Sequence, residues 1–190
     1  MPKSKNGPPL EDDAMRSLII PTLVTIALSA LATFSQVNEK CIHRAWITDT
    51  DPKGLNVRQK PAASAKVIGK IPFARDEGQQ TIVEITGYSN GWLRIRSAES
   101  VDGDVSFQGI GWISSKMATV NTERPDGNSS KPVSLFSLPD RRSKKAGTIP
   151  SDVLPRLIGY DCFGFKVEYK GKAGWLSAGD MCGNPVTTCP

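Results

Sequence analysis

One pattern of residues occurs twice in this chain, and the opening halves of the two copies lie a constant 78 positions apart. Each copy has a short apolar run, a proline, a second run that ends in Gly-x-Ile-Pro, and later a Gly-Trp pair. The positions that keep the interval are Leu55 with Val133, Pro61 with Pro139, Gly69 with Gly147 and Pro72 with Pro150. Self-similarity at a fixed spacing sets the unit of folding. The sequence therefore predicts two copies of one small module.

Apolar and polar residues alternate within the copies, as they do in half-buried strands. Residues 55–58 and 81–88 show this period of two. The Ser-Asn-Gly sequence at 89–91 predicts a hairpin turn, and residues 97–109 are interpreted as a polar loop. No amphipathic helical pattern follows the N-terminal segment. We therefore expect an all-β fold.

These patterns predict two modules, at residues 45–120 and 132–182. Residues 121–131 contain no apolar side chain and are predicted to be a linker. A C-terminal tail at 183–190 carries Cys189. A module of about 50–75 residues has a marginal core and often needs covalent support. The cysteines of the chain could supply that support.

The N-terminal segment has the features of an export signal. Residues 18–32 carry no charge and end in Ala-Leu-Ala, the small-x-small pattern that precedes a signal-peptidase cut. The acidic residues at 11–13 are unusual for a signal, and a start at Met15 would explain them. We expect residues 1–32 to be a cleaved signal peptide and the protein to be periplasmic or secreted. The alternative is a single-pass membrane anchor through residues 17–35.

The chain has four cysteines, an even number, all beyond the export segment. In an oxidising compartment this predicts two disulfides, whereas a zinc site would favour closer pairs of cysteines. Four cysteines allow three pairings, and their spacing does not choose among them. A hairpin turning at residues 170–171 would bring Cys182 back towards Cys162. On that topology we predict that Cys162 pairs with Cys182 and Cys41 with Cys189.

The formal net charge is +5, and it stays +5 without residues 1–32, which hold three basic and three acidic residues. A basic exported protein favours anionic surfaces such as wall polymers or lipid headgroups. Export argues against nucleic acid as a partner. A membrane contact is expected only through the N-terminal segment, if that segment is not cleaved.

The first copy resembles the bacterial SH3-like (SH3b) domain. The motifs that carry the resemblance are Leu-Asn-Val-Arg at 55–58, Val-Ile-Gly-Lys-Ile-Pro at 67–72, Asn-Gly-Trp at 90–92 and Gly-Trp-Ile-Ser at 111–114. The second copy is more divergent and has Gly164 where the first has Trp92. The resemblance spans roughly residues 45–182 and implies two tandem small antiparallel SH3-like barrels. It also implies a non-catalytic exported module of the kind that often binds cell-wall peptide or glycan.

Catalytic signatures are absent from the sequence. His43 is the only histidine and lies beside Cys41, at the edge of the first module, where a nucleophilic Cys–His pair is poorly placed. No phosphate-binding glycine loop or Gly-x-Ser-x-Gly elbow occurs, and the aspartates are scattered through turns. We predict no catalytic residue, no metal and no cofactor.

Tryptophans and one basic run are the candidate binding residues. We expect Trp112 and Trp175 to be core aromatics, because each follows a glycine in a strand of a small barrel. Trp92, beside a hairpin turn, is a candidate for stacking on a ligand. A basic run in the second copy is the other candidate for the ligand-binding site, and a solvated loop is its simpler explanation. Its basic residues are Arg141, Arg142, Lys144 and Lys145.

The sequence leaves two functional hypotheses. The first is an exported, non-catalytic module that associates with peptidoglycan, through cell-wall peptide or glycan, or with another envelope component. The second is an envelope scaffold that binds a protein and has no affinity for glycan. An enzyme is disfavoured.

Overall fold

The structure, a computed structural model, describes residues 41–123 and 130–186. By the contacts within the chain, the described residues all belong to one compact unit. The predicted export segment and Cys189 lie outside the described residues. Within the described ranges, no helix has the length and apolar character needed to cross a membrane. These ranges contain antiparallel strands and two short 3-10 helices, which confirms the all-β prediction.

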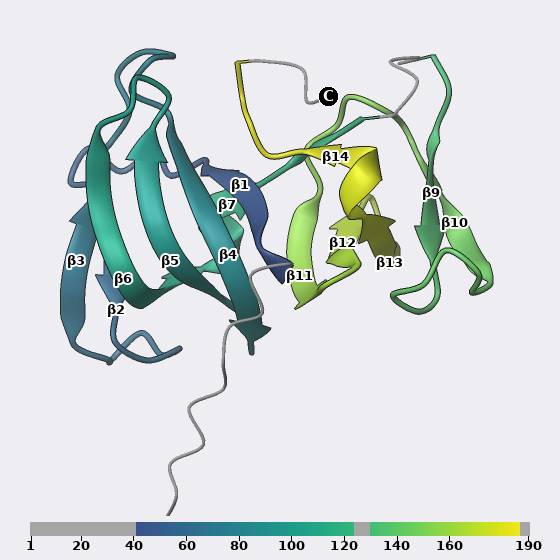
Figure 1. The fold of residues 1–190 in the computed structure, drawn as a ribbon, viewed down its shortest axis with the longest axis horizontal. Coiled ribbons are helices and arrows are strands. Elements are labelled where there is room, and N and C mark those ends of the chain that lie inside the picture. Colours follow the sequence, from purple (N-terminus) through teal and green to yellow (C-terminus); the bar gives the residue numbers. More distant parts are fainter. Residues whose placement is uncertain (1–40, 124–129, 187–190) are drawn as a thin grey trace, which may run out of the picture. The chain divides into compact units, whose positions relative to one another are not determined.

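The first sheet has seven strands in the order β3-β2-β6-β5-β4-β1-β7 (Figure 1). Its strands are β1 (His43–Ile47), β2 (Leu55–Arg58), β3 (Val67–Ile71), β4 (Thr81–Ser89), β5 (Trp92–Ser100), β6 (Val105–Ser114) and β7 (Ala118–Thr119). The 3-10 helix η2 (Ser115–Met117) joins β6 to β7. The Ser114 hydroxyl caps η2 by accepting a hydrogen bond from the Lys116 backbone N–H.

The second sheet has five strands in the order β10-β9-β13-β12-β11. Its strands are β9 (Val133–Phe136), β10 (Lys145–Ile149), β11 (Arg156–Asp161), β12 (Gly164–Tyr169) and β13 (Lys172–Ser177). The 3-10 helix η3 (Ala178–Asp180) follows β13, as η2 follows β6, and has its own serine cap, Ser177. The order of these five strands matches that of β3-β2-β6-β5-β4 in the first sheet.

The two sheets also share an irregularity in strand pairing. Val57 pairs with Gly69, but its neighbour Arg58 pairs with Val67, so one residue of β3 is skipped. Strands β9 and β10 skip a residue at the position 78 further along the chain, where Leu135 pairs with Gly147 and Phe136 with Lys145. The constant interval in the sequence therefore corresponds to the same local backbone geometry, including a β-bulge.

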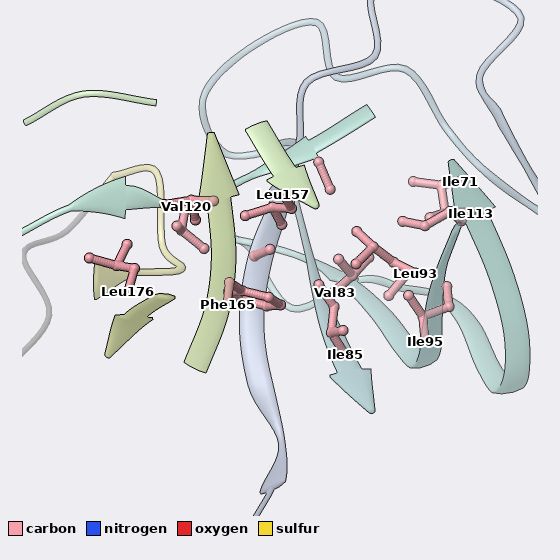
Figure 2. Close-up of a cluster of buried hydrophobic side chains, with 14 of the residues drawn as sticks. Ile71, Val83, Ile85, Leu93, Ile95, Ile113, Val120, Leu157, Phe165 and Leu176 are labelled. Atoms are coloured by element: carbon pink, nitrogen blue, oxygen red, sulfur yellow. The ribbon is translucent and has the colours of Figure 1, made fainter. Parts of the chain in front are cut away.

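A single cluster of buried side chains extends through both sheets. Figure 2 shows Leu93, Ile95 and Ile113 of the first sheet in this cluster. Leu157, Phe165 and Leu176 of the second sheet belong to the same cluster. Each of these six side chains is fully buried, as the alternation of apolar and polar residues predicts for the inner face of a strand.

Two predictions about connecting segments are wrong. The expected polar loop at 97–109 is mostly strand, because β5 and β6 continue through it as a long hairpin beside β4 (Figure 1). Ala98 pairs with Phe107 there, and these two side chains give the hairpin an apolar contact that the polar composition concealed. The predicted linker also starts too early, because Asn121–Thr122 forms strand β8 and pairs with β14 (Met181–Cys182).

The predicted disulfide pairing is wrong as well. Cys41 is bonded to Cys162, which excludes Cys162 with Cys182 and Cys41 with Cys189. The residue that follows Cys41 by two, His43, donates a hydrogen bond from Nε2 to the Asp161 carbonyl at 2.8 Å, so β1 begins against the β11–β12 turn. The hairpin argument failed because Cys182 lies in β14, which pairs with β8. Cys182 is also in a disulfide.

Candidate functional site

A row of three side chains crosses the first sheet from β2 through β6 to β5. Trp112 on β6 pairs with Arg58 on β2 and with Arg94 on β5. Directly paired residues point to the same face of a sheet, so the indole lies between two guanidinium groups on neighbouring strands. All three side chains are half-buried. Ile113, which follows Trp112, and Leu93, which precedes Arg94, face the core instead.

Trp92 belongs to the same face. It precedes Arg94 by two positions on β5, and strand residues two apart share a face. Trp92 pairs with Ser114 while Trp112 pairs with Arg94, which makes the two indoles diagonal neighbours, with Cα atoms about 7–8 Å apart. We call Arg58, Trp92, Arg94 and Trp112 the tryptophan face.

A glycine on the next strand leaves space for the Arg94 side chain to lie close to the sheet. Gly87 of β4 pairs with Arg94, and a Cβ placed on it would lie 3.5 Å from the Arg94 Cβ. The Arg94 stem therefore extends over Gly87, beside Trp112. Indole faces stack on flat or apolar ligand surfaces, and a guanidinium binds carboxylates through two parallel hydrogen bonds. The tryptophan face combines both kinds of recognition on regular strands.

The second sheet has an incomplete version of this face. Trp175 pairs with Lys166 and with Phe136, in the positions that Arg94 and Arg58 occupy around Trp112. Gly159 lies beneath Lys166 as Gly87 lies beneath Arg94. The second indole is missing, however, because Gly164 stands where Trp92 is. Phe136 is buried against the ring of Phe163 instead of presenting a charge.

Trp112 and Trp175 are not the core aromatics that the sequence predicted. Both are half-buried, and the residues that follow them, Ile113 and Leu176, are the fully buried ones. The glycine of each Gly-Trp pair also faces inward: a Cβ on Gly111 would clash with Val57, and one on Gly174 with Leu135. Adjacent strand residues face opposite sides, so the glycine lies against the core and the tryptophan outside. Trp46 of β1 is the buried indole of the described residues.

Three of the predicted basic residues lie in the loop between β9 and β10, and the fourth, Lys145, is the first residue of β10. All four are on the other sheet from Trp92. Arg141 contacts Asp180 at 3.0 Å and donates a hydrogen bond to the Ser177 hydroxyl at 2.9 Å. Arg142 pairs with Asp140, whose pKa is lowered by the Arg142 backbone N–H and then by its side chain. Lys144 and Lys145 are exposed. In this basic run, the two arginines therefore make contacts within the protein, and the two lysines are exposed to solvent.

His43 and Cys41 are both engaged in structural contacts. Cys41 is in the disulfide, and the His43 ring packs against Tyr160 and Phe165 with centroid distances of 5.4 and 5.5 Å. Burial lowers the pKa of His43, although the hydrogen bond to the Asp161 carbonyl and the Asp161 charge oppose the shift. This pair has no free thiol for nucleophilic chemistry. The described residues include no cluster of His, Cys, Asp or Glu that could hold a metal ion.

Glu84 is a partly buried carboxylate that the sequence analysis did not single out. It accepts hydrogen bonds from Arg96 Nε at 2.6 Å and from the Ser97 hydroxyl at 3.0 Å. Burial raises its pKa, but these hydrogen bonds and the charges of Arg96 and Arg44 outweigh burial and lower it overall. Glu84 and Glu99 line a cavity of about 170 Å³ on β4 and β5. A carboxyl group kept charged in this way is suited to an ion pair rather than to proton donation.

Comparison with solved structures gives matches of low similarity. NlpC2 from Trichomonas vaginalis is 15% identical, with a TM-score of 0.32, covering 75% of this chain and 48% of that one. NlpC1 from the same organism is 15% identical, with a TM-score of 0.32, covering 74% of this chain and 45% of that one. An NlpC/P60 family protein from Bacillus cereus is 14% identical, with a TM-score of 0.24, covering 73% of this chain and 55% of that one. The chain thus spans about half the length of these structures.

Comparison with curated proteins finds no match. Comparison with family models matches residues 53–118 to the bacterial SH3 domain. This range begins just before β2 and ends at the first residue of β7, so it includes the whole tryptophan face. The resemblance drawn from the sequence motifs is confirmed for this segment: residues 53–118 contain one bacterial SH3 domain.

Proposed function

We propose that this protein is an exported, non-catalytic binding protein with two SH3-like barrels, which associates with peptidoglycan or another component of the cell envelope. The tryptophan face is the observation that carries the proposal. It lies within the bacterial SH3 domain and presents two half-buried indoles with Arg94 beside them. Partial exposure is what a ligand platform needs, because a fully buried indole could not reach a ligand.

The chemistry of this face suits a peptide or glycan of the cell wall. Sugar rings and extended peptides offer flat or apolar surfaces that stack on indoles. Carboxylates of such a ligand would pair with Arg58 or Arg94. Arg58 is held in place by donating from Nη1 to the Ala65 carbonyl at 2.8 Å, which leaves its other donors for a ligand.

The equal strand order and the shared bulge support two copies of one barrel. We infer that the first copy is the main ligand-binding copy, since the second lacks the Trp92 equivalent and buries Phe136 where the first presents Arg58. The Cys41–Cys162 disulfide supports export to the periplasm or beyond, because disulfides persist in oxidising compartments. A membrane anchor through residues 17–35 is compatible with the same location.

A protein-binding scaffold is the second candidate, and one feature favours it. The edge strand β3 exposes Val67 and Ile68, at 43% and 40% of their surfaces, and β6 exposes Val105 and Ile110. An unpaired edge strand with exposed apolar side chains is a common site for another protein chain.

Retention on insoluble peptidoglycan separates the two candidates. We expect the purified protein to be retained, and Trp92→Ala to lower its affinity about two- to tenfold, since stacking on one aromatic contributes about 0.5–1.5 kcal/mol. Trp175→Ala, on the incomplete face, is the matched control and should change affinity less than twofold. Absence of retention for the wild-type protein would favour the scaffold, and equal losses for both variants would exclude the tryptophan face as the main site.

A further inference from the structure

A hollow of about 310 Å³ lies at one end of the second sheet, away from the tryptophan face. It is bounded by the segment that leads into β9, the end of β10 and the start of β13. The groups in its lining that can donate to a ligand are the ammonium groups of Lys131 and Lys172 and the Thr148 hydroxyl, because the Ser151 hydroxyl already donates to the Thr122 carbonyl at 3.4 Å. No Asp or Glu is among the described residues that line it.

Lys172 is oriented by the protein itself. Its ammonium group donates a hydrogen bond to the Thr148 carbonyl at 3.1 Å, across from β13 to β10. An ammonium has three hydrogens, so two remain for a ligand. The contact fixes the charge at the wall of the hollow instead of leaving it at the end of a mobile side chain, which lowers the entropic cost of binding.

The charges of residues 130–186 also favour an anionic ligand. Residues 130–186 hold nine Lys and Arg against five Asp and Glu, whereas residues 41–123 hold ten against nine. The three arginines of residues 130–186 all pair with carboxylates: Arg141 with Asp180, Arg142 with Asp140 and Arg156 with Glu168. None of its six lysines has an ion pair with a described carboxylate. The unpaired positive charge is therefore carried by lysines, and Lys131 and Lys172 share the hollow.

We propose that this hollow binds a phosphate group, as a free phosphate or phosphate ester or as the headgroup of an anionic lipid. Two ammonium groups and the Thr148 hydroxyl border this space, and none of the described residues that line it carries a carboxylate. Phosphate oxygens are strong acceptors that can take hydrogen bonds from several directions, which suits lysines acting as point charges. The proposal does not depend on the proposed function, since the two sites lie on different sheets and recognise different chemistry.

Inorganic phosphate is the first probe, added to the isotope-labelled full chain while amide chemical shifts are followed. We expect shifts centred on residues 148–151 and 172, saturating at about 1–10 mM, because exposed charge pairs are individually weak. Chloride at the same ionic strength should not reproduce them. Shifts distributed evenly over all exposed lysines, or no saturable shift, would overturn the proposal.

A pair of double variants provides the matched test. Lys131→Ser with Lys172→Ser should weaken phosphate binding about tenfold, whereas Lys144→Ser with Lys145→Ser removes the same charge from the same sheet and should change it less than twofold. Equal losses in the two double variants would show a general charge effect and overturn the site. The single variant Lys131→Gln, at an exposed position, should weaken binding about threefold and leave the Lys172 contact intact.

Glycerol 3-phosphate and lipid vesicles distinguish the two sources of the phosphate. Retention on phosphatidylglycerol vesicles but not on phosphatidylcholine, lost with Lys131→Ser and Lys172→Ser, would support the site and identify a lipid headgroup. Binding of glycerol 3-phosphate without retention on either vesicle would support the site and identify a soluble or polymeric phosphate ester. Vesicle retention that is unchanged in this double variant, together with no binding of glycerol 3-phosphate, would refute the site.

Discussion

The two sheets are closely alike where they face the core and different where they face outward. Leu93 and Ile113 of the first sheet correspond in pairing to Phe165 and Leu176 of the second, and all four are buried. The outer positions diverge: Trp92 is replaced by Gly164, and the long β5–β6 hairpin by the tight turn at residues 170–171. Packing constrains the inner face, while the outer face is free to change its ligand chemistry.

We propose that this difference gives the two sheets different binding roles. The first sheet has nearly balanced charges and a complete tryptophan face, whereas the second has surplus lysines and an incomplete one. The inner faces of both sheets belong to one cluster of buried side chains, so we expect the two sheets to unfold together even though we propose different ligands for their surfaces.

The largest effect is expected from emptying the shared core. Phe165→Ala should lower the free energy of unfolding by about 3–5 kcal/mol, because Phe165 is fully buried and packs against His43 of the first sheet. Leu93→Ala, at the corresponding position, should cost about 2–5 kcal/mol. Urea denaturation followed by fluorescence and by circular dichroism should give one coincident transition for each variant. Two separate transitions would mean that the sheets are independent domains.

The disulfide is the next strongest link between the sheets. Cys41 and Cys162 are 121 residues apart in sequence, and closing so long a loop restricts the unfolded chain substantially. Cys41→Ser with Cys162→Ser should lower stability by about 2–5 kcal/mol under non-reducing conditions. Peptide mapping without reduction should recover the Cys41–Cys162 link, and recovery of Cys162 bonded to Cys182 would restore the pairing predicted from the hairpin.

The shared core and the disulfide show what the sequence could and could not predict. The alternation of residues and the 78-residue interval predicted strands and inner faces, because both depend on local geometry. The pattern did not show which member of each Gly-Trp pair faces inward, since Gly111 and Trp112 necessarily face opposite sides. Spacing could not predict the disulfide pairing either, because it depends on how β1 meets the β11–β12 turn. Similarly, the residues next to Arg141 in the sequence did not indicate that it binds Asp180, because Asp180 follows β13.

Two glycines at equivalent positions test how far the likeness of the sheets extends. A Cβ on Gly69 would lie 2.6 Å from the Phe107 ring, which comes from the long hairpin, whereas one on Gly147 would meet nothing within 4 Å. Gly69→Ala should therefore cost about 1–3 kcal/mol through overpacking. Gly147→Ala should be neutral or stabilise by up to about 1 kcal/mol, by restricting the unfolded chain. Equal effects in thermal unfolding would mean that Phe107 does not cover β3.

His43 should make the contact between the sheets sensitive to pH. Burial lowers its pKa below the usual 6.5, so the unfolded chain takes up a proton at higher pH than the folded chain. Stability should be greatest above about pH 6.5 and fall as the pH decreases towards the folded pKa, by at most about 1.4 kcal/mol per pH unit. His43→Gln should flatten the profile between pH 7.5 and 5. An unchanged slope in that variant would assign the dependence to other groups.

The smallest effect concerns the basic loop, where the structure separates arginine from lysine. Arg141 binds the buried Asp180 and the Ser177 hydroxyl, so Arg141→Ser deprives Asp180 of one of its partners and should cost about 1 kcal/mol. Lys144→Ser, three positions along the same loop, removes the same charge from an exposed site and should change stability by less than about 0.5 kcal/mol. Paired urea titrations measure the difference. If the two variants were equally stable, the Arg141–Asp180 pair would contribute nothing to folding, and Arg141 would be as available to an anionic partner as Lys144 is.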